Sequence, residues 1–385
     1  MRLLRHILLS VLLTGCLCGC EYYFPLEGLD DGAKLYVQCI AGNSDRTYIN
    51  VQKAMGVNST GSDILPDVES IVLKVNGREC SVERVVIPDP PVPGYYDPEL
   101  GYVSDMGQDY PSEYYTLRRY NLWSTDTPIK EGDDLSLEVS ARGMETVSAN
   151  VSVPQKIVIQ DVKAAPRCST ITEVDYTYTE KFMSFDVNLA DVSPDGYYGL
   201  GIECEETGKN TYSDGREETY SYSHYAQIIT WSSATGMVDD LQESQGEWID
   251  AYYNNYFIDS YGNERMQLIK GDCLKDGHMK FDCSIPFSLE GDSDIYEYND
   301  ETGDLELSGQ VHICIESKYR LYIYRVSPEF YRYNKAQYLL RTNYLAEVGL
   351  SPSTFSYTNV RGGFGLLGAL SVTTTPWYLS PAEPE

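Results

Sequence analysis

The chain has 385 residues, with 58 Asp and Glu against 29 Lys and Arg, so its formal net charge is −29 at pH 7. No segment carries a compensating run of Lys or Arg, which argues against nucleic acid as a partner and against electrostatic attraction to anionic lipid. The length favours two domains over one, because single hydrophobic cores stop growing at about 250 to 300 residues.

The first 19 residues have the pattern of an export signal. Arg2 and Arg5 precede an apolar run at 7–13 that is too short to span a bilayer. An ordinary secretory signal is the alternative, but three cysteines at 16, 18 and 20 would then be accidental. Removal of the signal also removes Arg2 and Arg5, so the net charge falls from −29 to −31.

Lipoprotein processing requires a leucine-like residue, two small residues and a cysteine whose thiol receives the lipid. Leu17-Cys18-Gly19-Cys20 meets this requirement and places Glu21 after the anchor, whereas Leu13-Thr14-Gly15-Cys16 is the alternative. We predict a signal peptide over 1–19, lipid attachment at Cys20 or alternatively at Cys16, and a tether over 20–32. Two or more acyl chains make release from a membrane negligible, so we expect a membrane-bound protein.

The residues after the tether read as a series of short strands. Alternating runs rich in Val, Ile, Thr and Tyr are separated by turn residues, at the spacing of an antiparallel β-sandwich. The runs lie at 35–40, 47–51, 70–75, 114–120, 134–141 and 146–153. We predict a first β domain over 33–154, closed by Pro154.

A Pro- and Tyr-rich segment at 87–113 interrupts this domain. It holds six prolines, four tyrosines and four aspartates, and is too rich in proline for a central strand. Long loops in compact domains are usually functional or disordered, and the aromatic content argues against simple disorder. We predict ligand or partner contacts at Tyr95, Tyr96, Tyr102 and Tyr110.

A second series of strands predicts another β domain over 155–385, either a larger sandwich or a barrel-like fold. Its runs lie at 156–162, 183–189, 197–204, 226–231, 266–269, 278–285, 305–317 and 319–326. A helix is predicted at about 328–342, because Ser327 suits the N-cap, Pro328 the first helical position and Glu329 the positive end of the helix dipole. Phe330, Tyr333, Gln337 and Leu340 recur at helical spacing and should face the second sheet system.

The end of the chain resembles the Bacteroidota lipoproteins of the domain-of-unknown-function 4249 family. The resemblance is carried by a Tyr-rich helix at 330–340, by Tyr357-Thr358-Asn359-Val360 and by the glycine-rich tail Arg361-Gly362-Gly363-Phe364-Gly365. It extends to Asp195-Gly196-Tyr197-Tyr198 and to the strand at 34–40, which in that family opens an immunoglobulin-like sandwich. The segment at 87–113 looks like an insertion.

That resemblance implies an outer-membrane lipoprotein that faces the cell surface, since Glu21 fits the acidic residues that follow the anchor in surface-displayed members of the phylum. It also implies a TonB-dependent barrel with a lid lipoprotein as partners, in the uptake of a glycan or peptide. Such an association is not a mechanism.

Few residues form a recognisable catalytic or metal-binding motif. Gly363, Gly365 and Gly368 have the spacing of a dinucleotide-binding turn, but β-branched residues follow them, so we expect glycines that allow close backbone packing. Cys273 and Cys283 flank an Asp-Gly turn that predicts a hairpin, with plain packing of the two thiols as the first interpretation. A disulfide between them and a zinc site that includes His278 are the alternatives. We expect no metal, no cofactor and no catalytic residue. The acidic run at 292–304 predicts a solvated hairpin tip.

Tyrosine is the remaining signal, with 34 residues. Tyr and Trp provide amphipathic contact area at low entropic cost, and Tyr is equally a strand former. We therefore add Trp248, Tyr252, Tyr253 and Tyr256 to the predicted contacts. The predicted function is that of a non-enzymatic surface lipoprotein, an accessory ligand-binding subunit of a nutrient-uptake complex. A stand-alone adhesin and a carboxylate-based hydrolase are the alternatives.

Overall fold

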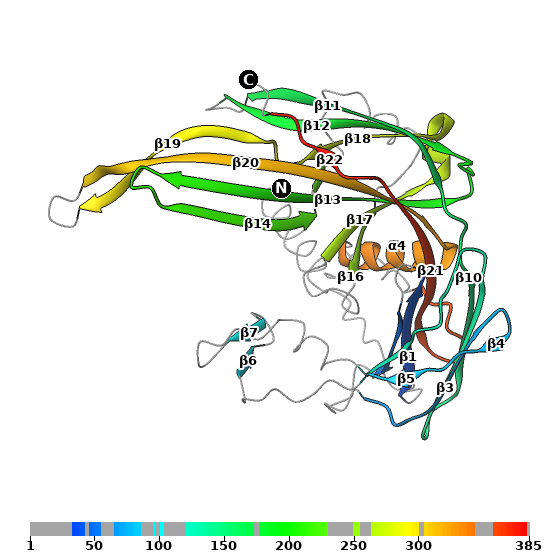
Figure 1. Ribbon diagram of the computed structural model, residues 1–385. Helices are drawn as coiled ribbons and strands as arrows, with labels where there is room; N and C mark the ends of the chain where they lie inside the picture. The colour runs from blue at the N-terminus through cyan, green and yellow to red at the C-terminus, as the bar shows by residue number, and fades with distance from the viewer. Residues whose placement is uncertain are drawn as a thin grey trace, which may run out of the picture.

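The computed structural model describes residues 33–42, 46–54, 65–85, 95–97, 101–103, 121–172, 177–225, 227–229, 249–254, 263–299, 304–342 and 357–382. These residues are mainly β, with a single α-helix, as the sequence predicted. Figure 1 shows a lower lobe, an upper lobe of long strands and the helix α4 between them. Within the described residues, no helix has the length and apolar character needed to cross a membrane.

The lower lobe is a β-sandwich of two sheets. One contains β1 (Lys34–Ala41), β2 (Thr47–Ala54), β8 (Leu122–Thr125) and β5 (Glu83–Arg84), and the other contains β10 (Val147–Ser152), β9 (Asp134–Ala141), β3 (Val68–Val75) and β4 (Arg78–Glu79). Alternate residues of β1 and β9 point into the core between the sheets, as the period of two requires. Asn76 and Gly77, both with positive φ, turn the chain between β3 and β4.

The upper lobe is built from strands up to 23 residues long, and its described strands form two sheets that do not close into a barrel. One sheet contains β16 (Ile249–Asn254), β17 (Asn263–Lys270), β13 (Tyr197–Tyr212), β14 (Glu217–Tyr225), β20 (Asp304–Val326), β19 (Leu289–Asn299) and β22 (Tyr378–Leu379). The second contains β11 (Val158–Thr172), β12 (Thr177–Ala190), β18 (His278–Ser284) and β15 (Gln227–Ile229), with the 3-10 turns η1 (Gly271–Cys273) and η2 (Lys275–Gly277) nearby. Phe185, Phe281 and Leu321 are among the residues buried between the sheets.

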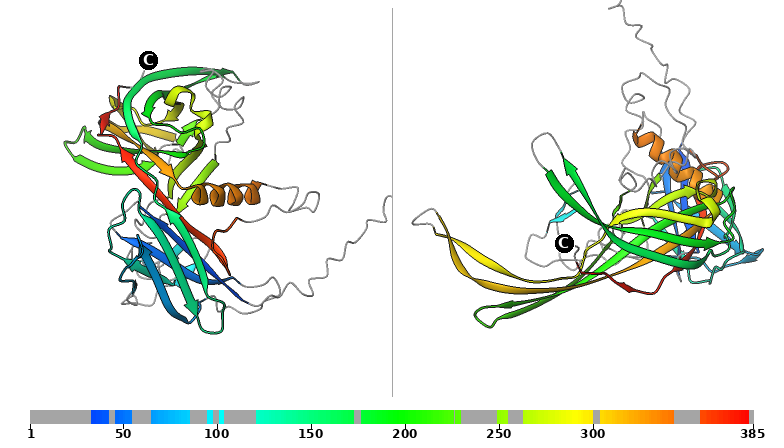
Figure 2. Two further views of the ribbon diagram at one scale, coloured as in Figure 1. Left: turned by 90° about the vertical axis from the view of Figure 1, so that its right-hand side faces the viewer. Right: turned by 90° about the horizontal axis from the view of Figure 1, so that it is seen from above.

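Strand β21 (Phe364–Thr374) joins the two lobes through hydrogen bonds. Its first half pairs in parallel with β1, and its second half pairs antiparallel with β20, so one sheet runs continuously through both lobes. Figure 2 shows β21 crossing from the upper lobe into the lower one. The division of the chain near Pro154 stays a prediction, but this crossing strand places a C-terminal segment in the lower lobe.

The closing motif has a clear structural role in this crossing. The Asn359 side chain donates to the carbonyl oxygen of Leu367 at 2.8 Å and accepts from its N–H at 3.0 Å, so it satisfies the backbone as a neighbouring strand would. Gly365 has φ of +117°, and a Cβ there would lie 1.9 Å from the Val37 carbonyl oxygen. The glycines therefore allow close backbone packing, as predicted.

Helix α4 (Pro328–Thr342) has the predicted bounds and lies where the lobes meet. The Ser327 hydroxyl accepts from the N–H of Phe330 at 3.2 Å and from that of Ala369 at 3.3 Å, so one buried side chain caps the helix and fixes it to β21. Phe330 is buried as predicted, Tyr331 is buried beside it and Tyr333 is half-buried. The Leu340 side chain lies outside the described residues.

Candidate functional site

All eight predicted contact residues have side chains that lie outside the described residues. Tyr95 and Tyr96 belong to the backbone of β6 (Tyr95–Asp97) and Tyr102 to that of β7 (Gly101–Val103), which pair as a hairpin; Tyr252 and Tyr253 belong to β16, opposite Arg265 and Glu264. Tyr110, Trp248, Tyr256 and both candidate lipid cysteines, Cys16 and Cys20, lie wholly outside. These roles stay predictions.

The structure does locate the point where the Tyr-rich segment joins the fold. Strands β5 and β8 pair directly, with Glu83 opposite Ser124 and Arg84 opposite Trp123. The N–H of Val85 donates to the carbonyl oxygen of Leu122 at 2.9 Å. Because β5 precedes the segment and β8 follows it, both of its points of attachment lie at one edge of the lower sandwich.

A pocket of about 430 Å³ lies at this edge, a volume within the usual range for small-ligand sites. Its walls come from the residue before β2, from the segment around β5 and from the end of β8. Four hydroxyl side chains, two arginines, two carboxylates and one apolar side chain form the lining: Ser81, Ser124, Thr125, Thr127, Arg46, Arg84, Glu83, Asp126 and Val85. The two positive and two negative charges balance in an otherwise strongly acidic chain.

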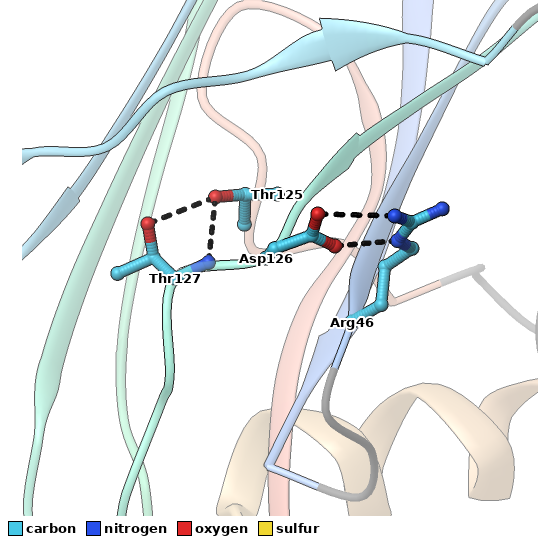
Figure 3. A network of polar contacts seen from close by, with 4 residues as sticks. All are labelled: Arg46, Thr125, Asp126 and Thr127. Atoms are coloured by element: carbon cyan, nitrogen blue, oxygen red, sulfur yellow. Dashed lines mark hydrogen bonds and ion pairs between the residues drawn. The ribbon is translucent and has the colours of Figure 1, made fainter.

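An arginine–carboxylate fork fixes one side of the pocket (Figure 3). Arg46 Nε donates to Asp126 Oδ1 at 2.5 Å and Nη2 donates to Oδ2 at 3.0 Å. The two residues meet because Thr47 of β2 pairs with Thr125 of β8, which places the preceding and following residues side by side. Hydrogen bonding from Arg46 lowers the pKa of Asp126. Both side chains are exposed, so the fork mainly orients the groups and adds little stability.

The backbone next to the fork is held by hydroxyl groups. Thr125 Oγ1 accepts from the N–H of Thr127 at 3.2 Å and donates to Thr127 Oγ1 at 3.0 Å, as Figure 3 shows. Thr125 is buried, with 2% of its surface exposed. The turn after β8 therefore has its own internal hydrogen bonds and does not need a ligand to be ordered.

Two polar groups of the pocket have no such bonds. Ser124 is only 9% exposed, yet its hydroxyl forms no hydrogen bond with any residue in the described ranges. The Arg84 guanidinium likewise has no ion pair within the described part of the chain. Arg84 is exposed, and the buried side-chain atoms without a hydrogen-bond partner in the described residues do not include the Ser124 hydroxyl. Because neither group is bonded to a described residue, both are candidate points of attachment for a polar ligand.

Sequence reasoning did not identify this pocket. Its residues come from three separate segments, and Arg46 and Asp126 are 80 positions apart. No motif marks them. Only the predicted insertion at 87–113 pointed to this part of the fold.

The other titratable clusters are structural pairs. His278 Nδ1 lies 2.8 Å from Asp186 Oδ1, and His312 Nδ1 lies 2.9 Å from Asp292 Oδ1. Among the described residues, no group of three or more His, Cys, Asp and Glu is placed to hold a metal ion. Cys283 is buried in the upper core, but the Cys273 side chain lies outside the described residues, so their disulfide stays a prediction.

The fold and the pocket define a two-lobed, mainly β protein with a polar site at the sheet edge where the Pro- and Tyr-rich segment is attached. The model of the family described as domain of unknown function DUF4249 matches residues 21–376. The chain therefore belongs to the DUF4249 family, as its closing motif predicted. No curated protein gives a significant match. No solved structure gives one either.

Proposed function

We propose that this chain is an outer-membrane lipoprotein, anchored through Cys20 and facing the cell surface, that binds a glycan as an accessory subunit of a TonB-dependent uptake complex. The export signal and the cysteine cluster support the anchor. The acidic composition supports an exposed body that does not adhere to anionic lipid by itself.

The observation that carries the binding role is the position of the pocket. Residues that line it belong to β5 and β8, the two strands from which the Tyr-rich insertion leaves and returns. A rigid sheet edge would thus supply hydrogen-bonding groups, and the predicted tyrosine contacts would add aromatic contact area. Loops held by a rigid scaffold are a common place for ligand binding.

The lining favours a glycan over a peptide. Four hydroxyls, two arginines and two carboxylates offer both donors and acceptors, which suits the many hydroxyl groups of a sugar. The balanced charge favours a neutral ligand. In this proposal Ser124 and Arg84 bind sugar hydroxyls directly, and the Arg46–Asp126 fork holds the end of β8 next to them.

Equilibrium binding of purified lipoprotein in detergent to neutral oligosaccharides tests the pocket. Ser124→Ala and Arg84→Ala should each weaken binding about tenfold, because one lost hydrogen bond to the ligand costs about 1.5 kcal/mol. Arg78→Ala, at an exposed arginine of β4 in the same lobe, is the matched control and should leave binding unchanged. Equal affinities in all three variants would contradict the proposed site. Selective binding of peptides would show that the ligand is a peptide and not a glycan.

The complex itself is tested by native pull-down through the C-terminus. Co-purification of a TonB-dependent barrel and a lid lipoprotein is the expected result. Glycan binding without either partner would favour a stand-alone adhesin. Hydrolysis of a bound glycan that disappears in Glu83→Gln would favour the carboxylate-based hydrolase, since Glu83 is the pocket carboxylate that has no arginine partner in the described residues.

A further inference from the structure

The hairpin of β19 and β20 projects beyond the rest of the upper lobe. The last register pair between β13 and β20 is Tyr212 with Val311, and Ser213 donates to the Gln310 carbonyl oxygen just beyond it. Past Gln310, only β19 accompanies β20 in the described residues. Figures 1 and 2 both show this hairpin reaching past the end of β13 and β14. Seven residues of strand, from 304 to 310, extend it by about 20 Å.

This two-stranded ribbon carries large apolar side chains that are exposed. Leu305 is 67% exposed, Leu307 is 59% exposed and Tyr296 is 55% exposed. Tyr296 and Leu307 are register partners, and Leu305 lies two residues from Leu307, so all three share one face. We call this face the tip patch. An isolated two-stranded hairpin is at best marginally stable in water, and exposed apolar clusters on such ribbons usually mark interaction surfaces.

The charges around the tip patch select its occupant. Residues 289–310 contain eight Asp and Glu and no Lys, Arg or His. Like charges oppose the docking of a second copy through the same patch, and they oppose an anionic lipid surface. A partner with an apolar centre surrounded by Lys and Arg would bury the leucines and form ion pairs with the acidic residues around them.

We propose that the tip patch, formed by Tyr296, Leu305 and Leu307, is a docking surface for a protein partner whose contact face is apolar at its centre and basic at its rim. The acidic rim speeds association and aligns the partner, and the leucines and tyrosine provide the buried contact. The patch lies on a different lobe from the polar pocket. Docking therefore does not rest on the proposed glycan site.

Site-specific photo-crosslinking of the full-length lipoprotein in its own cells tests this surface. A crosslinking residue at position 307 should give one discrete adduct, and mass mapping should place the attachment beside Lys or Arg of the partner. The matched control is position 379, because Leu379 is equally exposed, at 69%, but lies on β22. An adduct with a second copy, no adduct, or equal adducts at both positions would overturn the proposal.

The partner identified in this way is then purified and titrated against the intact lipoprotein. The double change Leu305→Glu and Leu307→Glu should weaken binding at least tenfold, whereas Leu379→Glu should change the Kd less than twofold. Raising NaCl from about 50 to 500 mM should weaken wild-type binding, since screening shortens the reach of surface charges. Unchanged affinity in the double variant or at high salt would refute the surface. Glycan binding by the double variant should remain normal, which separates this result from a failure of the pocket.

Discussion

Gly365→Ala should destabilise both lobes, because β21 is the strand that joins them. At this position φ is +117°, which an L-residue rarely adopts. The added Cβ would lie 1.9 Å from the Val37 carbonyl oxygen, and that atom belongs to a backbone that cannot move without disturbing β1. The change therefore adds backbone strain and pushes two paired strands apart.

The expected magnitude is about 3 kcal/mol or more. Holding a non-glycine residue in such a region costs about 1 to 3 kcal/mol. Each ladder hydrogen bond lost between β21 and β1 adds about 1 kcal/mol. The loss is a large share of the roughly 5 to 15 kcal/mol that stabilises a typical protein.

Urea unfolding followed by tryptophan fluorescence measures the effect, with Trp123 in the lower lobe and Trp377 next to β22 in the upper lobe. An m-value of about 3 kcal/mol/M predicts a fall in the midpoint of about 1 M. Gly291→Ala is the control, because a Cβ there meets nothing within 4 Å. If Gly365→Ala unfolds at the same urea concentration as Gly291→Ala, the role given to β21 is wrong.

Three further predictions concern groups that are buried or paired in the structure. Ser327→Ala should lower the free energy of unfolding by about 2 kcal/mol, because it leaves a helix N–H and a strand N–H without an acceptor. Thermal unfolding measures this loss, and a value below about 0.5 kcal/mol would contradict the role of Ser327 as a cap. Burial raises the pKa of the Cys204 thiol to about 12, so iodoacetamide at pH 8 should modify the exposed Cys314 in the folded protein and Cys204 only after unfolding, as peptide mass mapping would show. Since Arg46 lowers the pKa of Asp126, the carboxylate stabilises the fold above the ordinary pKa of Asp, and this contribution is lost as the pH falls through the lowered pKa of the folded state. In urea titrations, Asp126→Asn should therefore lose less stability than wild type between pH 6 and 3.

Local features of the fold were predictable from the sequence. The helix began and ended where Ser327 and the apolar spacing indicated, and the strand at 134–141 was predicted to the residue. Period-two alternation and capping are local signals, so neighbouring residues determine them. The runs at 305–317 and 319–326 proved to be one strand, β20, because β13 pairs with it continuously across Lys318.

Long-range pairing was not predictable in the same way. The parallel contact of β21 with β1 joins residues more than 300 positions apart, and nothing local in either strand specifies it. The pocket has the same origin, since Arg46 meets Asp126 only after β2 and β8 have paired. Sequence analysis singled out the Pro- and Tyr-rich segment but not the sheet edge to which it is attached.

Hydrogen exchange of the intact lipoprotein with and without a saturating neutral oligosaccharide tests the central claim most directly, because it reports where the ligand binds without any mutation. The account predicts slower exchange of the backbone amides at 81–85 and 124–127, which form the pocket wall. Ligand binding that leaves the exchange of both segments unchanged would contradict the proposed site.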